Sequence, residues 1–142
     1  MERHLLVLLL PERLERFLLE EQARTLLRAP GVVAVDPARL PLARFPAGLA
    51  AGVAVGQAKR MRLPGTPAAV AIFHPLQFYL GGALLARHPA AELWYGEPEP
   101  EARERLEELH LAAAERAALT FPVTPDLDIT PLQLRMLELG IN

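Results

Sequence analysis

Short, wholly apolar runs recur along this chain, separated by longer stretches in which apolar and charged residues mix. Residues 5–10, 32–35 and 70–73 are apolar without alternation, a pattern typical of strands covered on both faces of a parallel sheet. The first of these strands is predicted to begin at His4. Residues 91–95 and 119–123 predict two more strands, and Pro122 implies that the last one lies at a strand end or a sheet edge. Helices are predicted over residues 11–28, 47–61, 75–87, 101–118 and 130–140.

This alternation of strands and helices predicts an α/β protein with right-handed crossover connections. Residues 1–142 suit one Rossmann-like domain with three α/β/α layers around a mostly parallel, five-stranded sheet.

Glycines mark two of the predicted helices. Gly48, Gly52 and Gly56 recur at every fourth position, and we expect this small-residue face to pack closely on the sheet in preference to a membrane helix pair. Gly81 and Gly82 weaken the helix over 75–87 by roughly 2 kcal/mol relative to two alanines. Close packing there is the expected reason, with a nearby ligand as the alternative.

His74 is the residue whose predicted location points to chemistry. It ends the strand over 70–73 and precedes Pro75, so it lies at the carboxyl end of a strand and beside a helix N-terminus. Ligands of open α/β sheets bind at such edges. A neutral histidine there suits a hydrogen-bonding or general-base role near neutral pH. The alternative is a structural histidine that caps the helix or bonds a backbone carbonyl. Gln77 and Thr124 are predicted to lie along the same edge.

Composition narrows the functional classes. The chain has no cysteine, which excludes disulfides and thiolate chemistry and fits a reducing cytoplasm. It also has no serine nucleophile, and its bias toward Leu, Ala, Arg and Pro is consistent with a GC-rich, thermophilic source. The net charge of −2 argues against nucleic acid as the main partner.

Charge is unevenly distributed along the chain. Basic residues prevail in residues 1–71 and acidic residues in 72–142, which predicts separate basic and acidic surfaces. The cluster Lys59-Arg60-Met61-Arg62 is expected to be a solvated helix end, and phosphate or an acidic membrane surface is the alternative partner. The apolar segments are too short to span a bilayer, so peripheral membrane contact is the form left open.

Motifs for cofactors and metals are absent from the sequence. Neither GxGxxG nor GxxxxGK[ST] occurs, the four histidines lack metal-ligand spacing, and HExxH is missing. The sequence therefore predicts no cofactor and no metal. Glu97, Glu99 and Glu101 alternate in a proline-rich loop and are expected to be solvated, with an acid–base pair as the alternative.

Four phrases carry a resemblance to a known family. VVAVDP, AVAIFHPLQFYLGGALL, AELWYGEPE and LTFPVTPDLDITPLQLRMLELGIN are similar, in this order, to the N-terminal half of GT-B glycosyltransferases, especially retaining mannosyl- and glucosyltransferases. The resemblance implies the sheet order 3-2-1-4-5. It also implies an acceptor side of the catalytic cleft, formed by a carboxyl edge that carries Glu12, His74, Gln77, Glu97 and Thr124.

The chain departs from this family in two ways. Pro11-Glu12-Arg13 stands where members carry a glycine-containing loop, and the C-terminal domain that binds the nucleotide-sugar is missing. The resemblance thus implies a catalytically incomplete half that needs a donor-binding domain or subunit and takes a sugar or lipid-linked acceptor. The alternative is a stand-alone Rossmann-like binding or assembly module without enzymatic activity, which forms homo-oligomers through a small-residue or apolar face.

Overall fold

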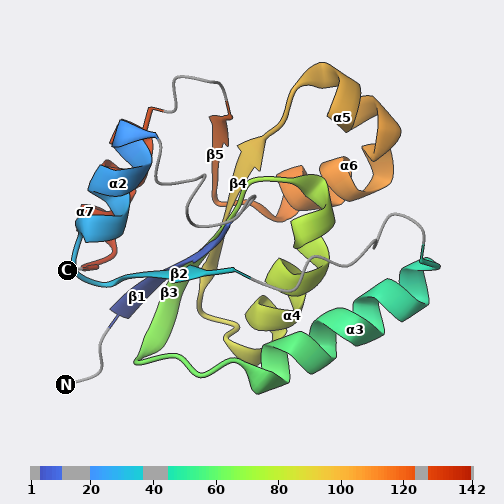
Figure 1. The fold of residues 1–142 in the computed structure, drawn as a ribbon, viewed down its shortest axis with the longest axis horizontal. Helices are drawn as coiled ribbons and strands as arrows, with labels where there is room; N and C mark the ends of the chain where they lie inside the picture. The colour runs from blue at the N-terminus through green and yellow to red at the C-terminus, as the bar shows by residue number, and fades with distance from the viewer. Residues whose placement is uncertain (1–3, 11–19, 37–44, 124–127, 142) are drawn as a thin grey trace.

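A single parallel sheet with helices on both faces organises the chain (Figure 1). The computed structural model describes residues 4–10, 20–36, 45–123 and 128–141. Its strands are β1 (His4–Leu9), β2 (Val32–Val35), β3 (Thr66–Ile72), β4 (Glu92–Glu97) and β5 (Leu119–Pro122). The predicted α/β, three-layer, five-stranded architecture is confirmed, and all four strand pairings are parallel.

The order of the strands is β2-β1-β3-β4-β5, so the expected order 3-2-1-4-5 is wrong. β3 lies between β1 and β4, where its residues 69–72 are buried on both faces. β2 takes the edge position, and its four residues are only half-buried or exposed. β3 has 7 residues and β2 has 4. Burial on both faces therefore removes more apolar surface from water when β3 takes the central position.

The helices form one layer on each face of the sheet. α2 (Glu21–Arg28) and α7 (Thr130–Glu138) cover one face, whereas α3 (Ala47–Arg60), α4 (Phe78–Arg87) and α6 (Glu107–Arg116) cover the other (Figure 1). α5 (Pro100–Arg105) precedes α6 at the end of β4. The predicted single helix over 101–118 is thus two helices, and Leu106 interrupts them with φ −123° and ψ 39°.

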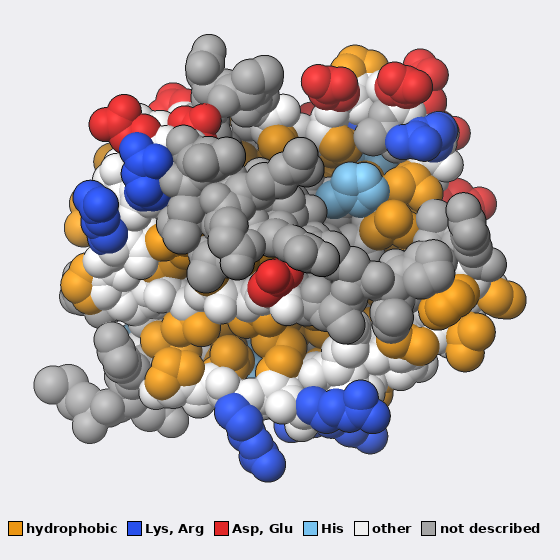
Figure 2. All heavy atoms as spheres, in the orientation of Figure 1, with side chains coloured by type: hydrophobic (Ala, Val, Ile, Leu, Met, Phe, Trp, Pro, Cys, Tyr) orange, Lys and Arg blue, Asp and Glu red, His pale blue; other side chains and the backbone are white. Residues whose placement is uncertain are grey.

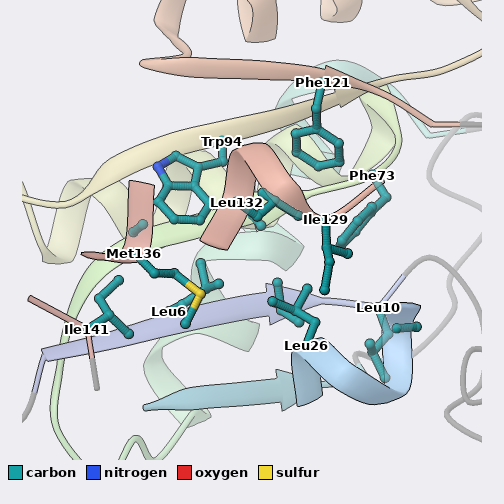
Figure 3. Close-up of a cluster of buried hydrophobic side chains, with 14 residues drawn as sticks. Leu6, Leu10, Leu26, Phe73, Trp94, Phe121, Ile129, Leu132, Met136 and Ile141 are labelled. Atoms are coloured by element: carbon teal, nitrogen blue, oxygen red, sulfur yellow. The ribbon is translucent and has the colours of Figure 1, made fainter. Parts of the chain in front are cut away.

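Two apolar cores separate along β1 according to the strand's period of two. Leu6 and Leu8 face the α2–α7 layer, and Val7 and Leu9 face the α3–α4 layer. In the first core, Trp94 of β4 lies against Leu132 and Met136 of α7 (Figure 3).

The glycine stripe of α3 does not pack on the sheet, so that expectation is wrong. Ala50, Ala54 and Ala58 form the buried face of the helix. A Cβ atom added at Gly48, Gly52 or Gly56 would meet nothing within 4 Å. The alanine methyls fill space between the helix and the sheet that glycines would leave empty, and such voids are destabilising.

Gly81 and Gly82 of α4 have different surroundings. A Cβ at Gly81 would lie 3.1 Å from Ile72 Cγ2, which confirms close packing there, whereas a Cβ at Gly82 would meet nothing within 4 Å.

The C-terminal helix ends where the sequence predicts. Gly140 has φ 69°, and the N–H of Ile141 donates to the carbonyl of Met136, which closes the last turn. At the other end the cap is supplied by Asp128, whose Oδ1 accepts from the N–H of Thr130 at 3.0 Å, and not by Thr130 itself.

Gly96 of β4 should tolerate no side chain. An alanine Cβ there would lie 2.6 Å from Val123 Cγ2 and 3.0 Å from Phe121 Cε2. We expect Gly96→Ala to lower the free energy of unfolding in urea by about 2 kcal/mol, because the overpacked neighbours must shift. Gly82→Ala is the matched control and should raise this free energy by up to about 1 kcal/mol, since it adds a better helix former in open space. Equal stability of the two variants would contradict this account of Gly96.

Candidate functional site

The carboxyl ends of β2, β1 and β3 are joined by a chain of hydrogen bonds that runs through Gln77. The N–H of Leu10 donates to the Val35 carbonyl at 2.9 Å. Gln77 Nε2 donates to the carbonyls of Leu9 and Leu10 at 3.0 and 2.8 Å, and Gln77 Oε1 accepts from the N–H of Phe73 at 2.7 Å. Both donors of the Gln77 amide are thus used within the protein, at the point where the sheet's own ladder ends.

His74 lies beside this bridge, at the carboxyl end of β3 as predicted. It caps the short 3₁₀ helix η2 (Pro75–Gln77), with Nδ1 accepting from the N–H of Leu76 at 3.2 Å. The predicted capping role is therefore present. The neutral ring consequently carries its proton on Nε2, for which the described part of the chain offers no partner. In this tautomer Nε2 can donate a hydrogen bond but cannot accept one.

Charge and burial keep His74 neutral. Desolvation by burial lowers the pKa of His74 below its usual value, and the positive charge of Arg105 on α5 lowers the pKa further. The ring is half-buried, so one part of it is open to solvent. Near neutral pH this edge accordingly presents an uncharged N–H donor.

Glu97 lies at the same level on the neighbouring strand. Ile72 of β3 pairs with Tyr95 of β4, and His74 and Glu97 each follow that pair by two residues. The Glu97 carboxylate lies 3.7 Å from Arg103 Nη1, and both side chains are about one-third exposed. Arg103 Nε is shielded from solvent and has no hydrogen-bond partner within the described ranges.

A hydrogen-bonded pair, Tyr95 of β4 and His110 of α6, lies next to Glu97 at this edge of the sheet. The sequence alone did not indicate this pair. The hydroxyl of buried Tyr95 is hydrogen-bonded to Nδ1 of His110 on α6, at 2.8 Å. Burial, and next the charge of Glu97, raise the pKa of Tyr95 to about 12, so its hydroxyl stays protonated. His110 also lines a hollow of about 330 Å³ between α5 and α6, together with Arg103, Glu104, Glu107, Pro100 and Leu111.

The structure thus brings together three of the five predicted site residues, His74, Gln77 and Glu97, with Gln77 used as a bridge. Glu12 and Thr124 lie outside the described residues. Figure 2 shows histidine atoms at the surface beside acidic and basic side chains over α5. The partly exposed side chains of this edge offer the N–H of His74 and the carboxylate of Glu97, whereas the buried hydroxyl of Tyr95 is bonded to His110. A donor and an acceptor on one edge suit a ligand with several hydroxyl groups.

Among the residues that the structure describes, no three His, Asp or Glu side chains come together to hold a metal ion. Within the same ranges, no helix has both the length and the apolar character needed to cross a bilayer. Comparisons with family models, with curated proteins and with solved structures found no match to this chain.

The first test concerns the protonation of His74. Its pKa is lower in the folded state than in the unfolded chain, so the unfolded state binds more protons below about pH 6.5. The folded state therefore has its full stability with respect to His74 above that pH, and it loses stability as the pH falls and His74 is protonated more readily in the unfolded chain. His74→Asn keeps a side-chain acceptor for the Leu76 N–H and removes the titration. We expect urea unfolding to show a smaller loss of stability between about pH 8 and pH 5 in His74→Asn than in the unaltered chain. Identical losses would contradict the neutral state of His74.

The second test concerns the Gln77 bridge. Gln77→Leu removes three hydrogen bonds to the backbone, those with the Leu9 and Leu10 carbonyls and with the Phe73 N–H, and should lower the free energy of unfolding by about 3 kcal/mol. Gln22→Leu, on the exposed side of α2, is the control and should change it by less than about 0.5 kcal/mol. If both variants unfold at the same urea concentration, the bridge contributes nothing to stability.

Proposed function

We propose that this chain is the N-terminal, acceptor-side half of a GT-B glycosyltransferase, and that its carboxyl edge binds the hydroxyl-bearing acceptor. The observation that carries the proposal is the uncharged Nε2–H of His74 at the junction of β1 and β3. In sheets of this order, ligands bind between two neighbouring strands from which the chain continues toward opposite edges of the sheet. Here these strands are β1, which is followed by β2 on one side, and β3, which is followed by β4 on the other.

The strand order is compatible with this proposal even though it differs from the one expected. The observed order β2-β1-β3-β4-β5 is itself a common doubly wound order, and its ligands also bind at the switch point, here between β1 and β3.

Each residue of the edge has a definite role in this proposal. His74 donates from Nε2 to an acceptor oxygen and so orients the hydroxyl that attacks the anomeric carbon of the donor sugar. The bond from that carbon to the phosphate of the nucleotide breaks, and the hydroxyl proton passes to the departing phosphate, which the donor-binding half holds. A general-base role does not fit the tautomer, because Nδ1 is occupied by the Leu76 N–H. Glu97 accepts from a second hydroxyl, and Gln77 positions the strand ends without touching the acceptor. The donor-binding half must supply the nucleotide-sugar site, and without it no transfer occurs.

A binding experiment tests the acceptor role. We expect ligand-observed NMR to detect weak binding of methyl α-D-mannopyranoside or methyl α-D-glucopyranoside to the chain. His74→Ala should weaken this binding on the order of tenfold, the factor expected for one lost hydrogen bond to the ligand. His88→Ala is the matched control, because His88 follows α4 at the opposite end of β3.

Three outcomes would contradict the proposal. They are the absence of binding by both glycosides, an equal loss in both histidine variants, and tight binding of UDP or GDP to the chain alone. The nucleotides should bind only when the chain is joined to a donor-binding domain, which should also restore sugar transfer.

A second candidate, the stand-alone assembly module, is favoured by one different observation. A mostly apolar hollow of about 500 Å³ separates α2 from α7, and Leu137 on its border is 72% exposed. A second copy could bury this face. Light scattering distinguishes the two candidates, because the assembly module requires a dimer that Leu137→Glu dissociates, and a monomer at all concentrations contradicts it.

A further inference from the structure

The outward face of α3 carries no charge over its first three turns. Leu49 and Val55 are exposed by 54% and 44%, and the glycines between and beside them leave the helix backbone open. The first charged residues of the helix are Lys59 and Arg60 in its last turn, followed closely by Arg62, and all three are exposed. An apolar face that ends in a basic cluster is therefore turned away from the protein.

The α3 and α4 part of this layer lacks acidic residues. No Asp or Glu occurs between Asp36 and Glu92, a span that includes all of α3 and α4. The exposed Arg87 at the end of α4 adds another cation to the layer. In Figure 2, the charged side chains at the lower border of the molecule are basic, whereas most of the visible acidic side chains lie near the top.

Complementary charge decides which partner fits this layer. A second copy of the same face offers no acidic residue on α3 or α4 to pair with these cations. A nucleic acid would favour a larger basic stripe with aromatic residues for stacking, and α3 has no aromatic side chain. A bilayer rich in anionic lipid satisfies both features, since headgroups attract the cations and the interfacial region accepts Leu49 and Val55.

We propose that α3, with the basic segment over residues 59–62, docks this protein on an anionic membrane surface. The helix lies along the surface, with Leu49 and Val55 at the depth of the headgroups and Lys59, Arg60 and Arg62 against lipid phosphates. Ala50, Ala54 and Ala58 stay in contact with the protein, so docking needs no unfolding. The α2–α7 layer, on the other face of the sheet, remains in solution.

Cosedimentation of the full chain with lipid vesicles tests this proposal. We expect binding to vesicles of equal parts phosphatidylglycerol and phosphatidylcholine, no binding to pure phosphatidylcholine, and release by added salt. Arg60→Gln should weaken binding about fivefold, the contribution of one basic side chain near an anionic surface. Arg28→Gln removes an exposed arginine from α2, on the other face, and should change nothing.

The apolar contribution has its own matched pair of variants. Leu49→Gln should weaken vesicle binding severalfold, and Leu137→Gln on α7 should leave it unchanged. Circular dichroism should show that all four variants stay folded. The proposal is overturned by equal binding to neutral vesicles, by no vesicle binding, by equal effects of Arg28→Gln and Arg60→Gln, or by tighter binding to a single-stranded DNA oligonucleotide than to anionic vesicles.

Discussion

One side-chain amide holds together the edge on which the candidate site is built. A parallel sheet runs out of ladder partners where its strands end, and backbone groups left there without water or a partner are costly. The single amide of Gln77 bonds the carbonyls of Leu9 and Leu10 and the N–H of Phe73. Because Leu10 is in turn bonded to Val35, the ends of three strands are held by one continuous set of hydrogen bonds.

This bridge also explains why His74 and Gln77 have different roles although they are three residues apart. The 3₁₀ turn between them directs the Gln77 amide back into the sheet and leaves the histidine ring at its margin. Phe73, just before the turn, is held from the other side by an edge-to-face contact with Phe121, with ring centroids 5.6 Å apart. A histidine carried by so constrained a backbone presents its free nitrogen in one orientation, and such preorganisation strengthens binding.

Local patterns in the sequence predicted the elements that depend on local physics. The unbroken apolar run over residues 70–73, the Pro75 that follows His74 and the Gly140 stop are each readable without knowledge of neighbours, and the structure confirms them. Strand order depends on which runs can be covered on both faces. The run over residues 32–35 has only four residues, and this shortness was the signal in the sequence that β2 lies at the edge. The resemblance instead implied the order 3-2-1-4-5, in which the second strand lies inside the sheet.

The candidate site was predictable only in part, because its remaining contacts join distant residues. Nothing local links Tyr95 to His110, which lies on α6, 15 residues further along the chain. In α3, alanines and glycines both recur at every fourth position, so spacing alone could not show which stripe faces the sheet. The cost of empty space between layers decides in favour of alanine.

The attachment of the last helix has a spectroscopic consequence. Arg135 of α7 is bonded to both carboxylate oxygens of Glu92, and Glu92 also accepts from the indole N–H of Trp94. Trp94 is the only tryptophan of the chain and is fully buried among residues that include Leu132 and Met136 of the same helix (Figure 3). The intrinsic fluorescence of this protein is therefore a reporter of one event, the seating of α7 on the sheet, and its emission will shift to the red when that helix lifts away even while the strands stay paired.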